Sequence, residues 1–166
     1  AMLAWLLVEK LRTGHASTLG AASGAVAGLV AITPCAGFVG GMAPIFIGLI
    51  AGAVCYLALT LKTRFNFDDS LDVIAVHLVG GILGALLLGF FSDTKVNSLG
   101  FDGVLFGGGS KLLVNQLIAI GATFAFSFIV TWVVAKILDA TIGLRVSTED
   151  ELVGLDQSQH AESAYQ

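Results

Sequence analysis

The sequence has few charged residues. Charged side chains make up 12% of its 166 residues and hydrophobic side chains 56%, and the mean hydropathy is +0.91. Residues 19–61 include no charged residue at all. A soluble domain of this length needs far less apolar surface to fill its core, and about 20 apolar residues suffice for one helix across a bilayer. The composition therefore excludes an ordinary soluble protein and predicts a membrane protein.

Groups that carry enzyme or cofactor chemistry are also missing. The two cysteines, Cys35 and Cys55, lie in apolar segments expected at different membrane depths, so we predict small buried side chains and no disulfide. The glycines at 107–109 lack the following Lys-Ser/Thr of a phosphate-binding loop. No partners at metal-ligand spacing accompany His77, and no catalytic constellation is present. We expect no enzyme activity, no metal and no cofactor.

Five apolar runs are bounded by charged or turn residues. Lipid favours helices for such runs, because a helix satisfies its own backbone hydrogen bonds and the alternation of a barrel strand is absent. The first run is too short to cross, so we expect the chain to begin partway along a helix. The predicted fold is an all-α membrane protein with four full spans and one partial span: 1–11, 17–39, 42–61, 71–91 and 112–138.

Basic residues divide unevenly between the two ends of the predicted spans. One side receives Lys10, Arg12, Lys62, Arg64, Lys136 and Arg145, and the other only Lys95 and Lys111. The positive-inside rule makes the first side cytoplasmic. We expect a transmembrane region over 1–144 and a cytoplasmic tail over 145–166. The net charge of −4 comes largely from this tail and gives no sign of nucleic-acid binding.

Small residues recur on two of the spans. Gly20, Gly24 and Gly28 follow one another at four-residue spacing, and Gly48 and Gly52 repeat the pattern. Such spacing lets helices in lipid approach closely, so it predicts a compact bundle.

His77 stands inside an apolar span. Gly80, Gly81 and Gly84 follow it at helical spacing, so we expect its face of the helix to offer open space. Ionisable residues within a span usually face a cavity or a bundle interior and mark a substrate or proton path. The alternative is a histidine that bonds a carbonyl of a neighbouring helix for stability alone.

Polar residues also stand at the ends of the spans. Asp68 or Asp69 is expected to cap the helix that carries His77, and Asp72 to bridge to another helix. Thr33-Pro34 predicts a kink in which the threonine hydroxyl bonds a freed carbonyl.

Several of these segments resemble the ammonium transporter (Amt/Mep/Rh) family, in family order. They are Gly20-Ala-Ala-Ser-Gly-Ala-Val-Ala-Gly-Leu-Val30 with Thr33-Pro34, then Asp68-Asp69 with Asp72 and His77, then Gly143-Leu-Arg-Val146 and the tail from Glu151 to Tyr165. The resemblance implies part of an eleven-helix fold, from a partial seventh span to the eleventh, in a trimer with one pore per subunit. Two departures are Ser70, where the family commonly has proline, and Ala161, where it commonly has glycine.

The resemblance also implies a function and a set of site residues. Ammonium would lose a proton and cross as ammonia past two pore histidines, of which His77 matches the second, with Val73 lining the pore. Thr33 and Asp72 would support it. A regulatory tail that binds PII-type signal proteins would include Arg145, Gly154, Asp156, His160, Glu162 and Tyr165. The alternative function is an ammonium sensor of the same fold.

Overall fold

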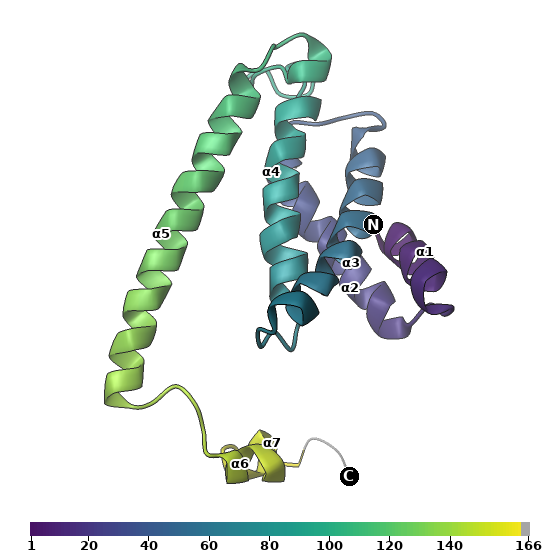
Figure 1. The fold of residues 1–166 in the computed structure, drawn as a ribbon. Coiled ribbons are helices and arrows are strands. Elements are labelled where there is room, and N and C mark those ends of the chain that lie inside the picture. The colour runs from purple at the N-terminus through teal and green to yellow at the C-terminus, as the bar shows by residue number, and fades with distance from the viewer. Residues whose placement is uncertain (164–166) are drawn as a thin grey trace. The chain divides into compact units, whose positions relative to one another are not determined.

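A computed structural model describes residues 1–163 as helices joined by turns and loops (Figure 1). Contacts divide the chain into two units, Ala1–Gly121 and Ala122–Gln166. The elements in order are α1 (Met2–Thr13), α2 (Thr18–Ile32), the 3₁₀ turn η1 (Thr33–Cys35), α3 (Ala43–Phe65), the π-helix η2 (Ile74–Val79), α4 (Gly80–Phe91), the 3₁₀ turn η3 (Val104–Phe106), α5 (Lys111–Thr141), α6 (Thr148–Val153) and α7 (Leu155–Ser158).

Among residues 1–163, four helices are long and apolar enough to cross a membrane, as predicted. They are Thr18–Cys35, Ala43–Phe65, Ile74–Phe91 and Lys111–Thr141. α1 has 12 residues, about 18 Å at 1.5 Å per residue, against the roughly 30 Å of a hydrocarbon core. The all-α fold class with four candidate spans is therefore confirmed, and α1 is too short to cross a membrane by itself.

The predicted boundaries need correction in three places. α2 stops at Ile32 rather than continuing to residue 39, because Pro34 has no N–H to extend the helix. α3 continues to Phe65, one turn beyond the prediction, before Asn66 adopts a left-handed conformation with φ 52°. The fourth span begins with a π-helix, which hydropathy does not reveal.

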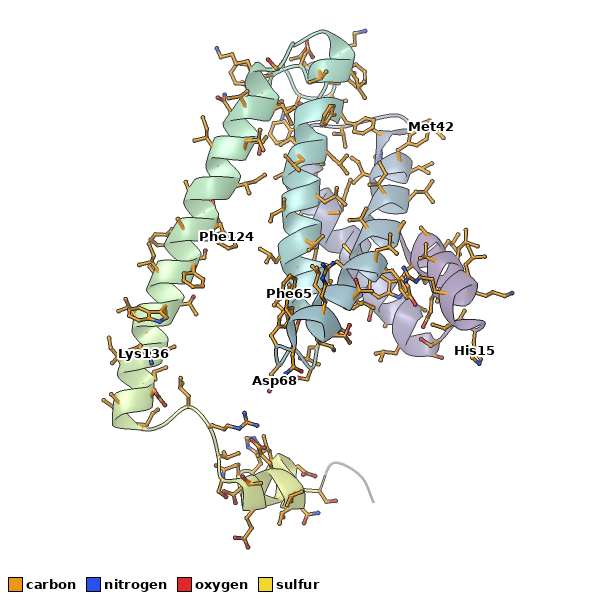
Figure 2. The ribbon with its side chains drawn as sticks, viewed as in Figure 1. His15, Met42, Phe65, Asp68, Phe124 and Lys136 are labelled. Carbon is orange, nitrogen blue, oxygen red and sulfur yellow. The ribbon has the colours of Figure 1, made fainter. Side chains whose placement is uncertain are left out.

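The N-terminal unit is an antiparallel bundle in which α1, α2 and α3 pack against one another and α4 packs on α2 and α3. Figure 2 shows His15, after α1, and Asp68, after α3, at one end of this unit, and Met42, before α3, at the other. The ends of successive spans thus alternate.

Close approach between these helices depends on the predicted glycines. A Cβ added to Gly24 would lie 2.6 Å from Cβ of Trp5, and one on Gly52 would meet the backbone of Ala1, 2.9 Å from its carbonyl carbon. Trp5 of α1 is 2% exposed and contacts Tyr56 of α3 edge to face, with ring centroids 5.6 Å apart. The small-residue pattern therefore brings α1 onto both neighbours.

The two cysteines lie in separate apolar clusters, and both are free and buried, as predicted. Cys35 packs with Ala31, Ile47 and Leu87. Cys55 belongs to the second cluster, defined by Trp5, Ala27, Cys55 and Val76. This second cluster is the one that reaches η2 and so bears on the position of His77.

The C-terminal unit contains most of α5 and the two tail helices. α5 has 31 residues, about 46 Å, which exceeds the thickness of a hydrocarbon core. After it, Ser147 caps α6 and Gly154, with φ 104°, separates α6 from α7.

Candidate functional site

His77 lies in the π-helix η2, at the start of the span Ile74–Phe91. A π-helix bonds each N–H five residues back rather than four, so its turn holds an extra residue, and such turns occur frequently at functional sites. The neighbours Ala75 and Val76 are 3% and 4% exposed. His77 itself is exposed on the other side of the helix, as is Val73 at 46%.

The His77 imidazole makes no hydrogen bond to any other residue within the described range 1–163. The alternative was that His77 bonds a carbonyl of a neighbouring helix for stability alone. No carbonyl among residues 1–163 accepts such a bond. A titratable side chain in an apolar span is left on an open face, beside the exposed Val73.

The glycine face predicted beside His77 is correct only for Gly81. A Cβ on Gly81 would meet nothing within 4 Å. One on Gly84 would instead meet the backbone of Ala31, and one on Gly80 would lie 3.4 Å from Sγ of Cys55. The physical reason is the extra residue of η2, which turns the later positions relative to His77 and brings Gly80 and Gly84 to the packed side.

The turn before η2 is built by two aspartates. Asp69 caps the span, since its carboxylate accepts hydrogen bonds from the N–H groups of Val73 at 2.8 Å and Ile74 at 2.9 Å. Asp72 accepts a 2.6 Å hydrogen bond from Nζ of Lys62 near the end of α3. The expected cap and the expected bridge to another helix are both present, and the sequence alone did not indicate Lys62 as the partner.

Thr33 lies where α2 ends. Its N–H bonds the carbonyl of Val30, three residues back, and its hydroxyl donates a 2.6 Å hydrogen bond to the carbonyl of Leu29. The hydroxyl thus satisfies the acceptor that the tightened turn releases, as predicted.

Thr33 and Asp72 lie near different ends of the span that carries His77. Thr33, at the end of α2, lies near the part after His77, and Asp72 lies before it. Next to Thr33, Sγ of Cys35 donates to the carbonyl of Gly84 at 3.3 Å, and Gly84 follows His77 by seven residues, about 10 Å along a helix. Asp72 precedes His77 by five residues. Neither is shown to contact the imidazole, while Val73 shares its exposed side.

A pocket in the loop after α4 was not predicted. It has a volume of about 250 Å³. The loop closes on itself through hydrogen bonds between side chains and backbone: the Ser92 hydroxyl donates to the carbonyl of Phe101 at 2.6 Å, and the N–H of Thr94 donates to the Asp102 carboxylate at 2.7 Å. The Thr94 bonds lower the pKa of Asp102. The lining residues are Thr94, Gly100, Phe101, Asp102, Gly108, Lys111, Leu112 and Asn115.

The predicted tail residues fall into a compact hydrogen-bonded segment. Arg145 pairs with Glu151 at 2.8 Å, and this bond lowers the pKa of Glu151. The carbonyl of Asp156 accepts a 2.9 Å bond from the N–H of Glu162, which closes the turn containing His160. Tyr165 lies outside the described residues.

Ala161 has φ 53°, the left-handed conformation that disfavours a Cβ. The position that departs from the family's glycine therefore holds a backbone conformation that glycine adopts readily.

Comparison with known proteins decides the family. Residues 1–165 match the Ammonium Transporter Family. The chain belongs to this family. It is 49% identical over 163 residues to an ammonium transporter of Bacillus subtilis, covering 98% of this chain and 40% of that protein.

Solved structures of the same family share the fold. The crystal structure of Saccharomyces cerevisiae Mep2 superposes with a TM-score of 0.81 at 36% identity, covering 89% of this chain and 34% of that one. A structure described as a sensor Amt protein also gives a TM-score of 0.81, at 27% identity, covering 95% and 38%.

The chain spans about two fifths of the length of the curated relatives it matches. It is part of a multi-pass membrane protein, and the family is one of transporters rather than enzymes. The family resemblance and the fold class predicted from the sequence are confirmed.

Proposed function

We propose that the full-length protein conducts ammonium or ammonia through an apolar pore, and that His77 bonds the substrate there. One observation carries the proposal: the His77 imidazole lies on the exposed side of an apolar span and has no hydrogen-bond partner among residues 1–163. Intramembrane ionisable groups are costly, so an unpartnered one on an open face is most readily explained by a ligand.

The mechanism follows from the cost of desolvation. A bare ion pays heavily to enter an apolar path, whereas neutral ammonia needs only one or two hydrogen bonds to replace those of water. In our proposal ammonium gives up its proton before the narrow region, and His77 bonds the neutral molecule. A second histidine, outside this chain, completes a relay that carries the proton.

Three further residues have supporting roles in this proposal. Val73 lines the pore beside His77, because it is exposed on the same side of the helix. Thr33 and Asp72 act through the backbone and do not touch the substrate. Their hydrogen bonds hold the end of α2 and the start of η2, respectively.

The topology we propose follows the charge distribution. Residues 1–144 form the membrane region and 145–166 a cytoplasmic tail, because six basic residues flank one side and two the other. In agreement with this, Figure 2 places His15 and Asp68, which follow these basic helix ends, at the same end of the N-terminal unit.

We further propose that the complete protein is a homotrimer whose tail modulates transport. The residues concerned are Arg145, Gly154, Asp156, His160, Glu162 and Tyr165, and a PII-type signal protein is the candidate partner. Support comes from the acidic, hydrogen-bonded segment that follows α5.

A sensor is the second candidate function. One related structure carries that description, and its fold matches this chain at a TM-score of 0.81. A sensor would bind ammonium without sustaining a current. Transport and sensing are therefore separated by the same electrical measurement.

The test is the ammonium-dependent current of liposomes that contain the full-length protein, wild type against His77→Ala. Loss of a hydrogen bond to the substrate should lower the current about fivefold to tenfold, since such a bond contributes about 1–1.5 kcal/mol. His15→Ala is the matched control, because His15 is exposed in a turn and its hydrogen bonds within residues 1–163 use only its backbone N–H and carbonyl, both with the Thr13 hydroxyl. Equal currents in wild type and His77→Ala would refute the pore role, and binding without current would favour the sensor.

A further inference from the structure

Lys62 connects the end of α3 to the turn that precedes the His77 helix. Its Nζ donates a 2.6 Å hydrogen bond to Asp72 Oδ1 and a 2.9 Å hydrogen bond to the backbone carbonyl of Asp69. The two side chains are partly shielded, with exposed fractions of 35% for Lys62 and 26% for Asp72. One cation thus holds both ends of the four-residue segment 69–72.

The other hydrogen bonds of this segment either close its own turn, where the N–H of Asp72 donates to the carbonyl of Asp69 at 3.3 Å, or lead into the first turn of η2. The Asp69 carboxylate accepts from the N–H groups of Val73 and Ile74, and the carbonyl of Asp72 accepts from the N–H of Val76 at 2.9 Å. Asp72 also has φ 57°, a conformation uncommon outside glycine, which must be held by its surroundings. The chain therefore enters the π-helix from a constrained backbone.

The π-helix needs such a constraint at its start. Its other anchor is the burial of Ala75 and Val76, with Val76 in the cluster that contains Cys55 of α3. If the start were free, the extra residue could be expelled into the turn and η2 could relax to an α-helix. A slip of one residue turns a helical side chain by about 100°, enough to move His77 off its exposed side.

We propose that Lys62 is a positioning residue for His77: through Asp72 and Asp69 it holds the register of η2 that directs the imidazole to the open face of the span. This inference rests on the proposed pore function of His77 and names what sets its orientation. Lys62 touches neither the substrate nor the imidazole. A partly exposed ion pair contributes little to overall stability. Replacing Lys62 should therefore change the orientation of the His77 imidazole and leave the stability of the fold nearly unchanged.

The experiment uses full-length protein in liposomes and four variants. Lys62→Met removes the charge but keeps an unbranched apolar side chain, and Lys62→Arg restores a cation. Asp72→Asn removes the partner charge while keeping a residue type that tolerates positive φ. Arg64→Met is the matched control, since Arg64 lies two residues further along α3 and forms no ion pair within residues 1–163.

We expect the ammonium current of Lys62→Met and Asp72→Asn to fall by up to about tenfold and by no more than in His77→Ala, because misplacing the imidazole costs at most what removing it costs. Lys62→Arg should recover most of the current, and Arg64→Met should match wild type. All variants should assemble, with melting temperatures within about 2 °C of wild type.

The deciding measurement repeats Lys62→Met in the His77→Ala background. If Lys62 acts through His77, it should change the residual current by less than about twofold there, because the two losses are not additive. If the double variant lost current by the product of the two single-variant losses, the positioning role would be overturned. An unchanged current in Lys62→Met, with an impaired His77→Ala, would overturn it as well. An unimpaired His77→Ala protein would instead overturn the pore function itself, and the positioning role with it.

Discussion

The two sides of the span Ile74–Phe91 differ in what they tolerate. The packed side presents Ala75, Val76, Gly80 and Gly84 to α2 and α3, and no larger side chain fits at Gly84, where an added Cβ would meet the backbone of Ala31. The exposed side presents Val73, His77 and Gly81, where Gly81 has nothing within 4 Å of an added Cβ. The packed side of the helix thus serves stability, and the exposed side is the one that we propose lines the substrate path.

The largest effect is expected from Gly84→Ala. The added methyl group meets backbone atoms that cannot rotate away, so the two helices must separate, at a cost of about 3 kcal/mol in the free energy of unfolding. Gly81→Ala is the control with the same chemical change on the open side, and it should leave the melting temperature unchanged or slightly raised. Thermal unfolding of the detergent-solubilised full-length protein gives both values, and equal destabilisation would erase the distinction between the two sides.

A smaller effect separates two neighbouring aspartates at the start of the span. Asp69→Ala removes the acceptor for the N–H groups of Val73 and Ile74 and should cost about 1–2 kcal/mol of stability. Asp68→Ala should cost far less, because Asp68 makes no hydrogen bond to another residue within 1–163. Unfolding curves of the two variants test this, and a greater loss for Asp68→Ala would show that the capping residue is wrongly assigned.

The sequence predicts some features of the span Ile74–Phe91 and misses others. The existence of the span, the unusual position of His77 and a cap by Asp68 or Asp69 follow from hydropathy and local chemistry, and the structure assigns the cap to Asp69. The π-helix does not, because Ile74-Ala-Val-His-Leu-Val79 has the composition of an ordinary apolar helix and the extra residue is held by Lys62, ten residues before Asp72. For that reason the sequence argument placed Gly80 and Gly84 beside His77, on the wrong side.

The loop after α4 was missed for a related reason. Its pocket depends on close backbone approaches between residues distant in sequence, such as Gly108 to Asp102 and Gly103 to Phe90. A run of glycines indicates flexibility or close approach but does not say which segments meet.

Ala161→Gly should have a smaller, stabilising effect, away from the span. Glycine adopts φ near 53° without the penalty of a Cβ, so the tail turn that includes the Glu162 to Asp156 bond should gain up to about 1 kcal/mol. Hydrogen exchange of the Glu162 amide in the full-length protein measures it. Faster exchange in the variant would show that the turn does not depend on this backbone angle.

The smallest effect concerns the loop after α4, at the other end of the span. Hydrogen bonds from Thr94 lower the Asp102 pKa below its ordinary value of 3.8, so the ionised carboxylate stabilises the folded loop above that value, and the contribution is lost as the pH falls through the lowered pKa. Asp102→Asn should therefore melt lower than wild type near about pH 6, with the gap narrowing near about pH 3. A gap independent of pH would rule out the carboxylate charge as its source.

The central claim is that substrate contacts His77, and nitrogen NMR of the full-length protein in lipid with ¹⁵N-labelled histidine tests it most directly. The difference between wild-type and His77→Ala spectra assigns the His77 ring resonances, and His15→Ala assigns those of an exposed histidine in the same chain. The account predicts that titration with ammonium at constant pH and ionic strength shifts the His77 ring resonances and leaves those of His15 in place. Unchanged His77 resonances at ammonium concentrations that saturate the current would contradict it.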